Sequence, residues 1–76
     1  MDRYRIDVDG VSYLASIEEE LGAAGGEPGW FAQVEGPNGA FPRGVRRRTR
    51  WSAVLDALEV VQAQHPSQGV GEPVPV

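Results

Sequence analysis

The segment of residues 49–65 constrains the fold most, because it is the only stretch with convincing helical periodicity. Thr49 can cap the first turn with its hydroxyl, and Pro66 ends the helix just after His65. A lone helix of this length is marginally stable in water, so it needs a sheet on which to bury its apolar side. The residues at helical spacing predict that side as one stripe: Trp51, Val54, Leu55, Leu58 and Val61.

Residues 3–17 predict a β-hairpin that supplies half of this sheet. Apolar and polar residues alternate on both sides of Asp9-Gly10, a pair that favours a type I′ turn because both central positions need positive φ. Leu14 falls on the opposite face, and residues 18–21 fit either the strand end or a short helical turn. The turn predicts three apolar pairs on one face: Val8 with Val11, Ile6 with Tyr13, and Tyr4 with Ala15.

Residues 30–47 predict a second hairpin. Asn38-Gly39 favours another type I′ turn, and Phe31 then lies on the face away from the core. Pro42 cannot donate a ladder hydrogen bond, so the strand after the turn should lie at a sheet edge or contain a bulge. With Asn38-Gly39 as a two-residue turn, the residues on the core face are Trp30, Ala32, Val34, Phe41 and Val45.

These elements predict a two-layer α+β fold. An antiparallel sheet of about four strands, made of two hairpins, packs against one C-terminal helix in a single domain of residues 1–65. Residues 22–29 are mostly small and predict a flexible loop between the hairpins. Residues 66–76 have few large apolar groups, so we expect a flexible, disordered C-terminal tail.

The composition indicates a cytoplasmic protein. The chain has no cysteine, which excludes disulfides and thiolate metal sites. No apolar run reaches the roughly 18 residues that a membrane span needs. The charged N-terminus has no apolar stretch of the kind found in signal peptides. We therefore expect no membrane partner.

The polar residues do not form a recognisable catalytic or metal-binding set. His65 is the only histidine, and its place at the helix end favours an interaction with the helix dipole, or simple solvent exposure, over nucleophilic catalysis. Asp7 shares a strand face with Arg3 and Arg5, so these charges should be solvated and partly paired. The glycines match no phosphate-binding motif. The sequence therefore predicts a protein that is not an enzyme, with no catalytic residues, no metal and no cofactor.

An arginine cluster is the sharpest local feature of a chain whose net charge is −4. Arginine forks bind the paired oxygens of phosphates and carboxylates, and this cluster leads into a helix N-terminus, which also favours anions. The cluster predicts a partner- or anion-binding surface, with an ordinary solvated strand end as the alternative. Its members are Arg43, Arg46, Arg47, Arg48 and Arg50.

Three segments follow the pattern of a known family. They are Gly-Val-Ser-Tyr-Leu-Ala at 10–15, Gly44 with Thr49, and Ala-Val-Leu-Asp-Ala-Leu at 53–58. Across roughly residues 4–63 the chain resembles HicB-type antitoxin domains, which have a partial double-stranded-RNA-binding-like fold. The acidic residue that follows the cap in that family is absent here, and only residues 66–76 follow the helix. The resemblance implies a domain that neutralises a protein partner without binding an operator.

The sequence thus predicts a small accessory or regulatory domain that binds a macromolecule. A protein partner is favoured, in an antitoxin-like or adaptor-like role, and a homodimer formed through sheet edges is one version of it. Leu14 and Phe31 are the candidate apolar interface residues. The alternative is binding of a nucleic acid or another polyanion through residues 43–50. A small-molecule pocket is the third option, although so short a domain seldom encloses the volume.

Overall fold

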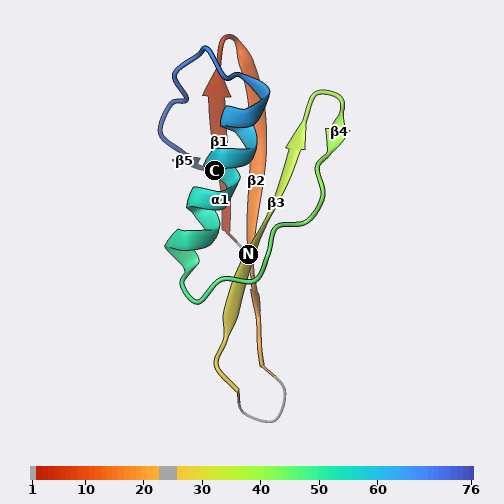
Figure 1. The fold of residues 1–76 in the computed structure, drawn as a ribbon, viewed down its shortest axis with the longest axis vertical. Helices are drawn as coiled ribbons and strands as arrows, with labels where there is room; N and C mark the ends of the chain where they lie inside the picture. Colours follow the sequence, from red (N-terminus) through yellow and green to blue (C-terminus); the bar gives the residue numbers. More distant parts are fainter. Residues whose placement is uncertain (1, 23–25) are drawn as a thin grey trace.

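A five-stranded antiparallel sheet carries one helix on one of its faces (Figure 1). The computed structural model describes residues 2–22 and 26–76, so part of the expected loop at 22–29 lies outside the described residues. The sheet order is β4-β3-β2-β1-β5, which confirms the two-layer α+β fold of two hairpins followed by a helix. The elements are β1 Asp2–Val8, β2 Val11–Glu20, β3 Gly29–Gly36, β4 Gly39–Ala40, α1 Arg50–Gln64 and β5 Val74–Pro75.

The first hairpin has the predicted turn and register. Asp9 and Gly10 both have positive φ, 50° and 73°, as a type I′ turn requires. Strand β2 continues to Glu20, which pairs with Gly29, so residues 18–20 belong to the strand and not to a helical turn. The three predicted apolar pairs are confirmed: Val8 with Val11, Ile6 with Tyr13, and Tyr4 with Ala15.

The second hairpin has a different turn from the one predicted. Gly36 pairs with Gly39, so Pro37 and Asn38 occupy the two central positions. Proline cannot adopt positive φ, and Asp9 is the only non-glycine among the described residues that does so. The type I′ prediction at Asn38-Gly39 was therefore wrong, because Pro37 excludes that turn type in the observed register.

Residues 41–47, which follow β4 and are called the return segment below, bulge away from β3 at Pro42. The proline in this position predicted an edge or a bulge. Ala40 pairs with Glu35, and Arg47 pairs with Trp30 through backbone hydrogen bonds of 2.8 and 2.7 Å. Between these two paired positions the chain advances seven residues from Ala40 to Arg47, whereas β3 has only five from Trp30 to Glu35. The two extra residues of the return segment bulge outward. Val45, expected in the core, is consequently 61% exposed, whereas Phe41 packs against the core.

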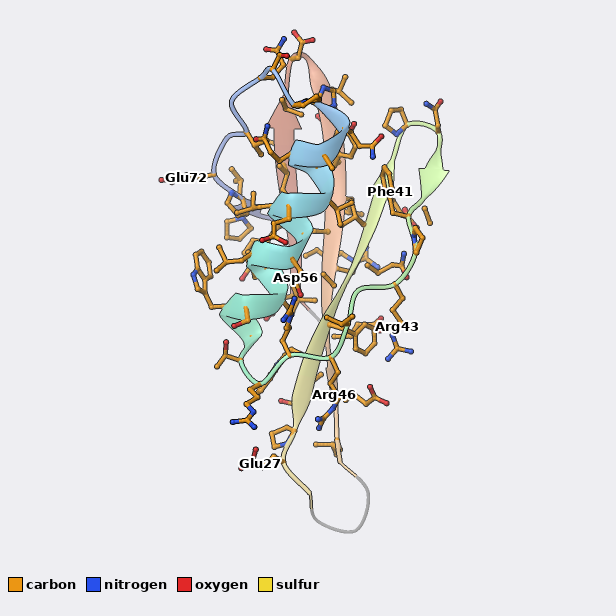
Figure 2. All side chains as sticks on the ribbon, in the orientation of Figure 1. Glu27, Phe41, Arg43, Arg46, Asp56 and Glu72 are labelled. Atoms are coloured by element: carbon orange, nitrogen blue, oxygen red, sulfur yellow. The ribbon has the colours of Figure 1, made fainter. Side chains whose placement is uncertain are left out.

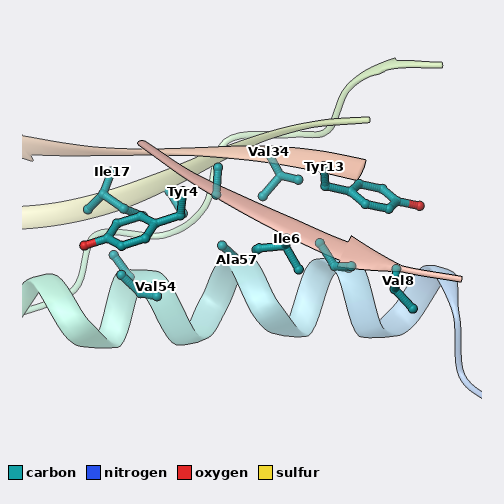
Figure 3. Close-up of a cluster of buried hydrophobic side chains, with 12 residues drawn as sticks. Tyr4, Ile6, Val8, Tyr13, Ile17, Val34, Val54 and Ala57 are labelled. Carbon is teal, nitrogen blue, oxygen red and sulfur yellow. The ribbon is translucent and has the colours of Figure 1, made fainter. Parts of the chain in front are cut away.

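The core lies between the sheet and a face of α1 that carries small side chains (Figure 3). From the sheet come Tyr4, Ile6, Val8, Tyr13, Ala15, Ile17, Ala32 and Val34, and from the helix come Ala53, Val54, Ala57 and Val61. Ala53 and Ala57 are fully buried, while Trp51 and Leu55 are 57% and 44% exposed. The predicted stripe was therefore wrong for Trp51 and Leu55. Large sheet side chains fill the interlayer space, so the helix turns its small residues toward them.

Side chains attach each end of the helix. Thr49 caps the first turn as predicted, because its Oγ1 accepts a hydrogen bond from the Ser52 N–H at 3.1 Å. At the other end His65 Nε2 lies 2.7 Å from the Tyr13 hydroxyl, and the two rings meet edge to face. The local pattern of His65 indicated the helix dipole or simple solvent exposure, whereas the structure shows a tertiary contact with Tyr13 of β2.

The C-terminal segment, expected to be a flexible tail, lies along β1 in the structure (Figure 1). Val74 pairs with Arg5, the Val76 N–H donates to the Arg3 carbonyl at 3.1 Å, and Val70 packs against the core. A two-residue strand that includes a proline has no periodicity, so the sequence pattern could not predict it. The pairing leaves Pro73 and Pro75 at the outer edge, where they have no N–H to donate to another strand.

On the outer face of the sheet, Asp7 accepts hydrogen bonds from Ser12 Oγ at 2.6 Å and from Arg5 Nε at 3.0 Å. The Ser12 hydrogen bond, followed by Arg5, lowers the pKa of Asp7. We expect Ser12→Ala to raise the Asp7 pKa toward its ordinary value, measured by NMR titration of the carboxyl carbon. Ser16→Ala, on the same face, is the control and should leave this pKa unchanged.

The pH dependence follows from the sign of that shift. Because the folded-state pKa is below the unfolded one, Asp7 stabilises the fold above its unfolded pKa, and this contribution is lost as the pH falls below about 4. Ser12→Ala should therefore make stability less sensitive to acid. An unchanged Asp7 pKa in this variant would contradict the assigned cause.

Candidate functional site

Arg43 covers a side chain that was expected to be exposed. Its guanidinium carbon lies 3.4 Å from the centroid of the Phe31 ring, and its Nη2 is 3.2 Å from a Glu20 oxygen. Phe31 is consequently only 7% exposed, so the prediction that it forms an apolar surface was wrong. Leu14 is half-buried beside a shallow pocket of about 360 Å³ on the outer sheet face.

Arg46 and Arg47 attach the return segment to its neighbours. Figure 2 labels Arg46 and the two residues to which these arginines donate, Glu27 and Asp56. Arg46 crosses Gly29, where a Cβ would clash with it, and donates to the Glu27 carbonyl. Arg47 forms a two-pronged pair with Asp56 of the helix, through Nε at 2.6 Å and Nη2 at 3.0 Å. The Asp56 carboxylate raises the pKa of Arg47, so the guanidinium stays charged throughout the usual pH range.

Arg50 joins the start of the helix to β1. It donates to the Asp2 carboxylate and to the Tyr4 hydroxyl. Arg48, in contrast, has no hydrogen bond or ion pair with any residue that the structure describes. Four of the five clustered arginines therefore bind acceptors of the protein itself. They clamp the return segment between sheet and helix instead of converging on one free surface.

The structure reveals a groove that the sequence reasoning missed. It has a volume of about 650 Å³, is open to solvent, and runs between one side of α1 and residues 70–73. Periodicity alone had assigned its largest residues to the core. Ala53 and Ala57, on the other side of the helix, were the available sign that this other side faces the sheet. The lining residues are Trp51, Leu55, Leu58, Glu59, Gln62, Val70, Gly71, Glu72 and Pro73.

The chemistry of this groove suits binding better than catalysis. Apolar side chains dominate its lining, and its titratable groups are the carboxylates of Glu59 and Glu72. Glu72 points into solvent from the segment beside the helix (Figure 2).

Across residues 2–22 and 26–76, no group of three or more histidine, aspartate or glutamate side chains is placed to hold a metal ion. The one described helix is too short to span a bilayer.

No protein-family model matches the sequence, and neither a curated protein nor a solved structure matches it. The resemblance to HicB-type antitoxin domains therefore stays a prediction. The groove, with its apolar lining and its two carboxylates, is the candidate functional site of this protein.

Proposed function

We propose that this protein is a non-enzymatic accessory domain of the cytoplasm that binds a protein partner through the groove between α1 and residues 70–73. One observation carries the proposal: the helix buries Ala53 and Ala57 and leaves Trp51 and Leu55, two large apolar side chains, 57% and 44% exposed. Burying a large apolar side chain contributes roughly 1.5–3 kcal/mol, so a partner that covers both would bind favourably. Tryptophan is also among the residues that dominate interface energies.

The surroundings of the groove support the same function. Leu58 and Val70 extend the apolar surface beyond Trp51 and Leu55, and polar side chains border it. An apolar centre with a polar rim is the usual anatomy of a protein interface. The proposal fits an adaptor-like or antitoxin-like role, in which the domain acts by covering part of another protein.

The alternative, binding of a nucleic acid or another polyanion, has less support. Most of the guanidinium groups in the cluster already donate to carboxylates or carbonyls of the chain. Within the described part of the chain, Arg48 is the member without such a partner. A cluster with a single unpaired arginine, on a protein of net charge −4, offers little attraction for a polyanion.

The test is affinity capture from the source cell with and without nuclease treatment. We expect the double variant Trp51→Ala/Leu55→Ala to lose the captured protein while keeping its far-UV circular dichroism spectrum. The matched control is Leu21→Ala/Val45→Ala, which removes two residues that are 75% and 61% exposed but lie outside the groove. Capture that survives the groove variant, or that disappears after nuclease treatment, would contradict the proposal.

A further inference from the structure

The helix that forms one wall of the groove has opposite charges toward its two ends. Arg48 is not a lining residue, but it immediately precedes the helix cap and stands three residues before Trp51, which lines the groove. Glu59 lies on the helix toward the other end, and Glu72 lies on the opposite wall. None of these three charges has a hydrogen bond or an ion pair with another described residue, although Glu59 is near enough to Arg47 to add, after Asp56, to the raised pKa of that arginine. Between the two ends the surface is apolar, with Leu55 near the middle.

A face of this kind is complementary to itself. A two-fold axis near Leu55, perpendicular to the helix, sets two copies of α1 antiparallel, which is the geometry of an isologous interface. Trp51 of one copy then lies opposite position 59 of the other. Arg48, just before the helix, then lies toward the Glu59 end of the helix in the second copy. The apolar centres meet, and each free arginine faces free carboxylates.

We propose that the occupant of the groove is a second copy of this chain, packed about this two-fold axis. The inference rests on the proposed function, because it uses the same groove and names its partner. A partner of one charge sign would meet a like charge at one end of the face, whereas a second copy meets an opposite charge at both ends.

The sheet edges offer no better route to a dimer. Strand β5 covers part of the β1 edge and places Pro73 and Pro75 outward. On the opposite side β4 is only two residues long and is followed by Pro42. Proline and very short strands are features that prevent pairing between edges. The edges are therefore poor surfaces for pairing, and the helix face is the one that exposes the large apolar side chains of Trp51 and Leu55.

Charge reversal tests the orientation as well as the surface. Sedimentation velocity of the full chain, from micromolar to millimolar concentration, should show a monomer–dimer equilibrium. We expect Arg48→Glu and Glu59→Arg each to weaken the dimer about tenfold, which corresponds to about 1.4 kcal/mol. The double variant Arg48→Glu/Glu59→Arg should restore it, because the opposite charges again face each other.

The controls separate this inference from the proposed function. Leu21→Ala/Val45→Ala should leave the dimer unchanged, whereas Trp51→Ala/Leu55→Ala should abolish it. A wild-type chain that stays monomeric throughout, or a dimer that survives the groove variant, would overturn the inference. So would a failure of the double charge reversal to restore association. If the wild type is monomeric but cell-derived protein is still captured in a Trp51-dependent way, the proposed function stands and only the second copy is rejected.

Discussion

Replacing Ile6 by alanine should destabilise this protein by about 2–5 kcal/mol, because the substitution leaves a cavity at the centre of the core. Ile6 is fully buried on β1, lies opposite Tyr13, and is among the largest completely buried side chains (Figure 3). A domain this small has little stability to lose, since its chain buries only roughly 60% of its unfolded surface. We expect a large unfolded fraction at room temperature, measured by urea denaturation followed by far-UV circular dichroism.

Leu14→Ala is the matched control for Ile6→Ala. Leu14 pairs with Arg5 in the same hairpin, but it lies on the outer face of the sheet and is only half-buried. Its truncation should cost clearly less than that of Ile6. Equal losses of stability in the two variants would show that the helix-covered face is not the main core.

Ala57→Leu should cost about 1–3 kcal/mol, because a larger side chain there would push the helix away from the sheet. Ala57 is completely buried and faces the sheet side chains (Figure 3). Leucine and alanine both favour helices, so intrinsic propensity contributes little to the expected loss. The same urea denaturation measures the effect.

Leu55→Ala provides the opposite comparison on the same helix. Leu55 is 44% exposed in the groove, so its truncation should change the free energy of unfolding by only about 0.5 kcal/mol. A helix packed on the sheet through the stripe predicted from periodicity would give the reverse order. A greater cost for Leu55→Ala than for Ala57→Leu would therefore contradict the observed rotation of the helix.

The first hairpin was predictable because two independent signals agree. The turn chemistry of Asp9-Gly10 and the alternation on both sides select the same register. In the second hairpin the signals conflict, since Pro37 excludes the turn that Asn38-Gly39 favours, and Pro42 interrupts the ladder. The structure resolves this conflict with a bulge, whose position no local rule specifies.

The orientation of the helix could not be read from its own sequence. The alanine face and the Trp51–Leu55–Leu58 face both have helical spacing, so periodicity alone does not choose between them. The choice depends on the space that the sheet side chains leave, which is a tertiary property. The groove was missed for the same reason.

The roles of the arginines were equally beyond local pattern. Arg50 reaches Asp2 across 48 positions of the chain, and Arg43 reaches Glu20 across 23. The cluster is contiguous in sequence, but its acceptors come from β1, β2, α1 and the segment just before β3. The run of arginines therefore predicted a partner molecule, whereas in the structure most of these arginines donate to acceptors of the same chain.

The attachments at the two ends of α1 bear on how the groove can bind. Arg50 joins the first turn to β1, and His65 joins the last to Tyr13 of β2. These two contacts oppose sliding or rolling of the helix on the sheet. The outer side of the helix is thus already shaped before a ligand arrives, and complex formation sacrifices little conformational freedom of the backbone.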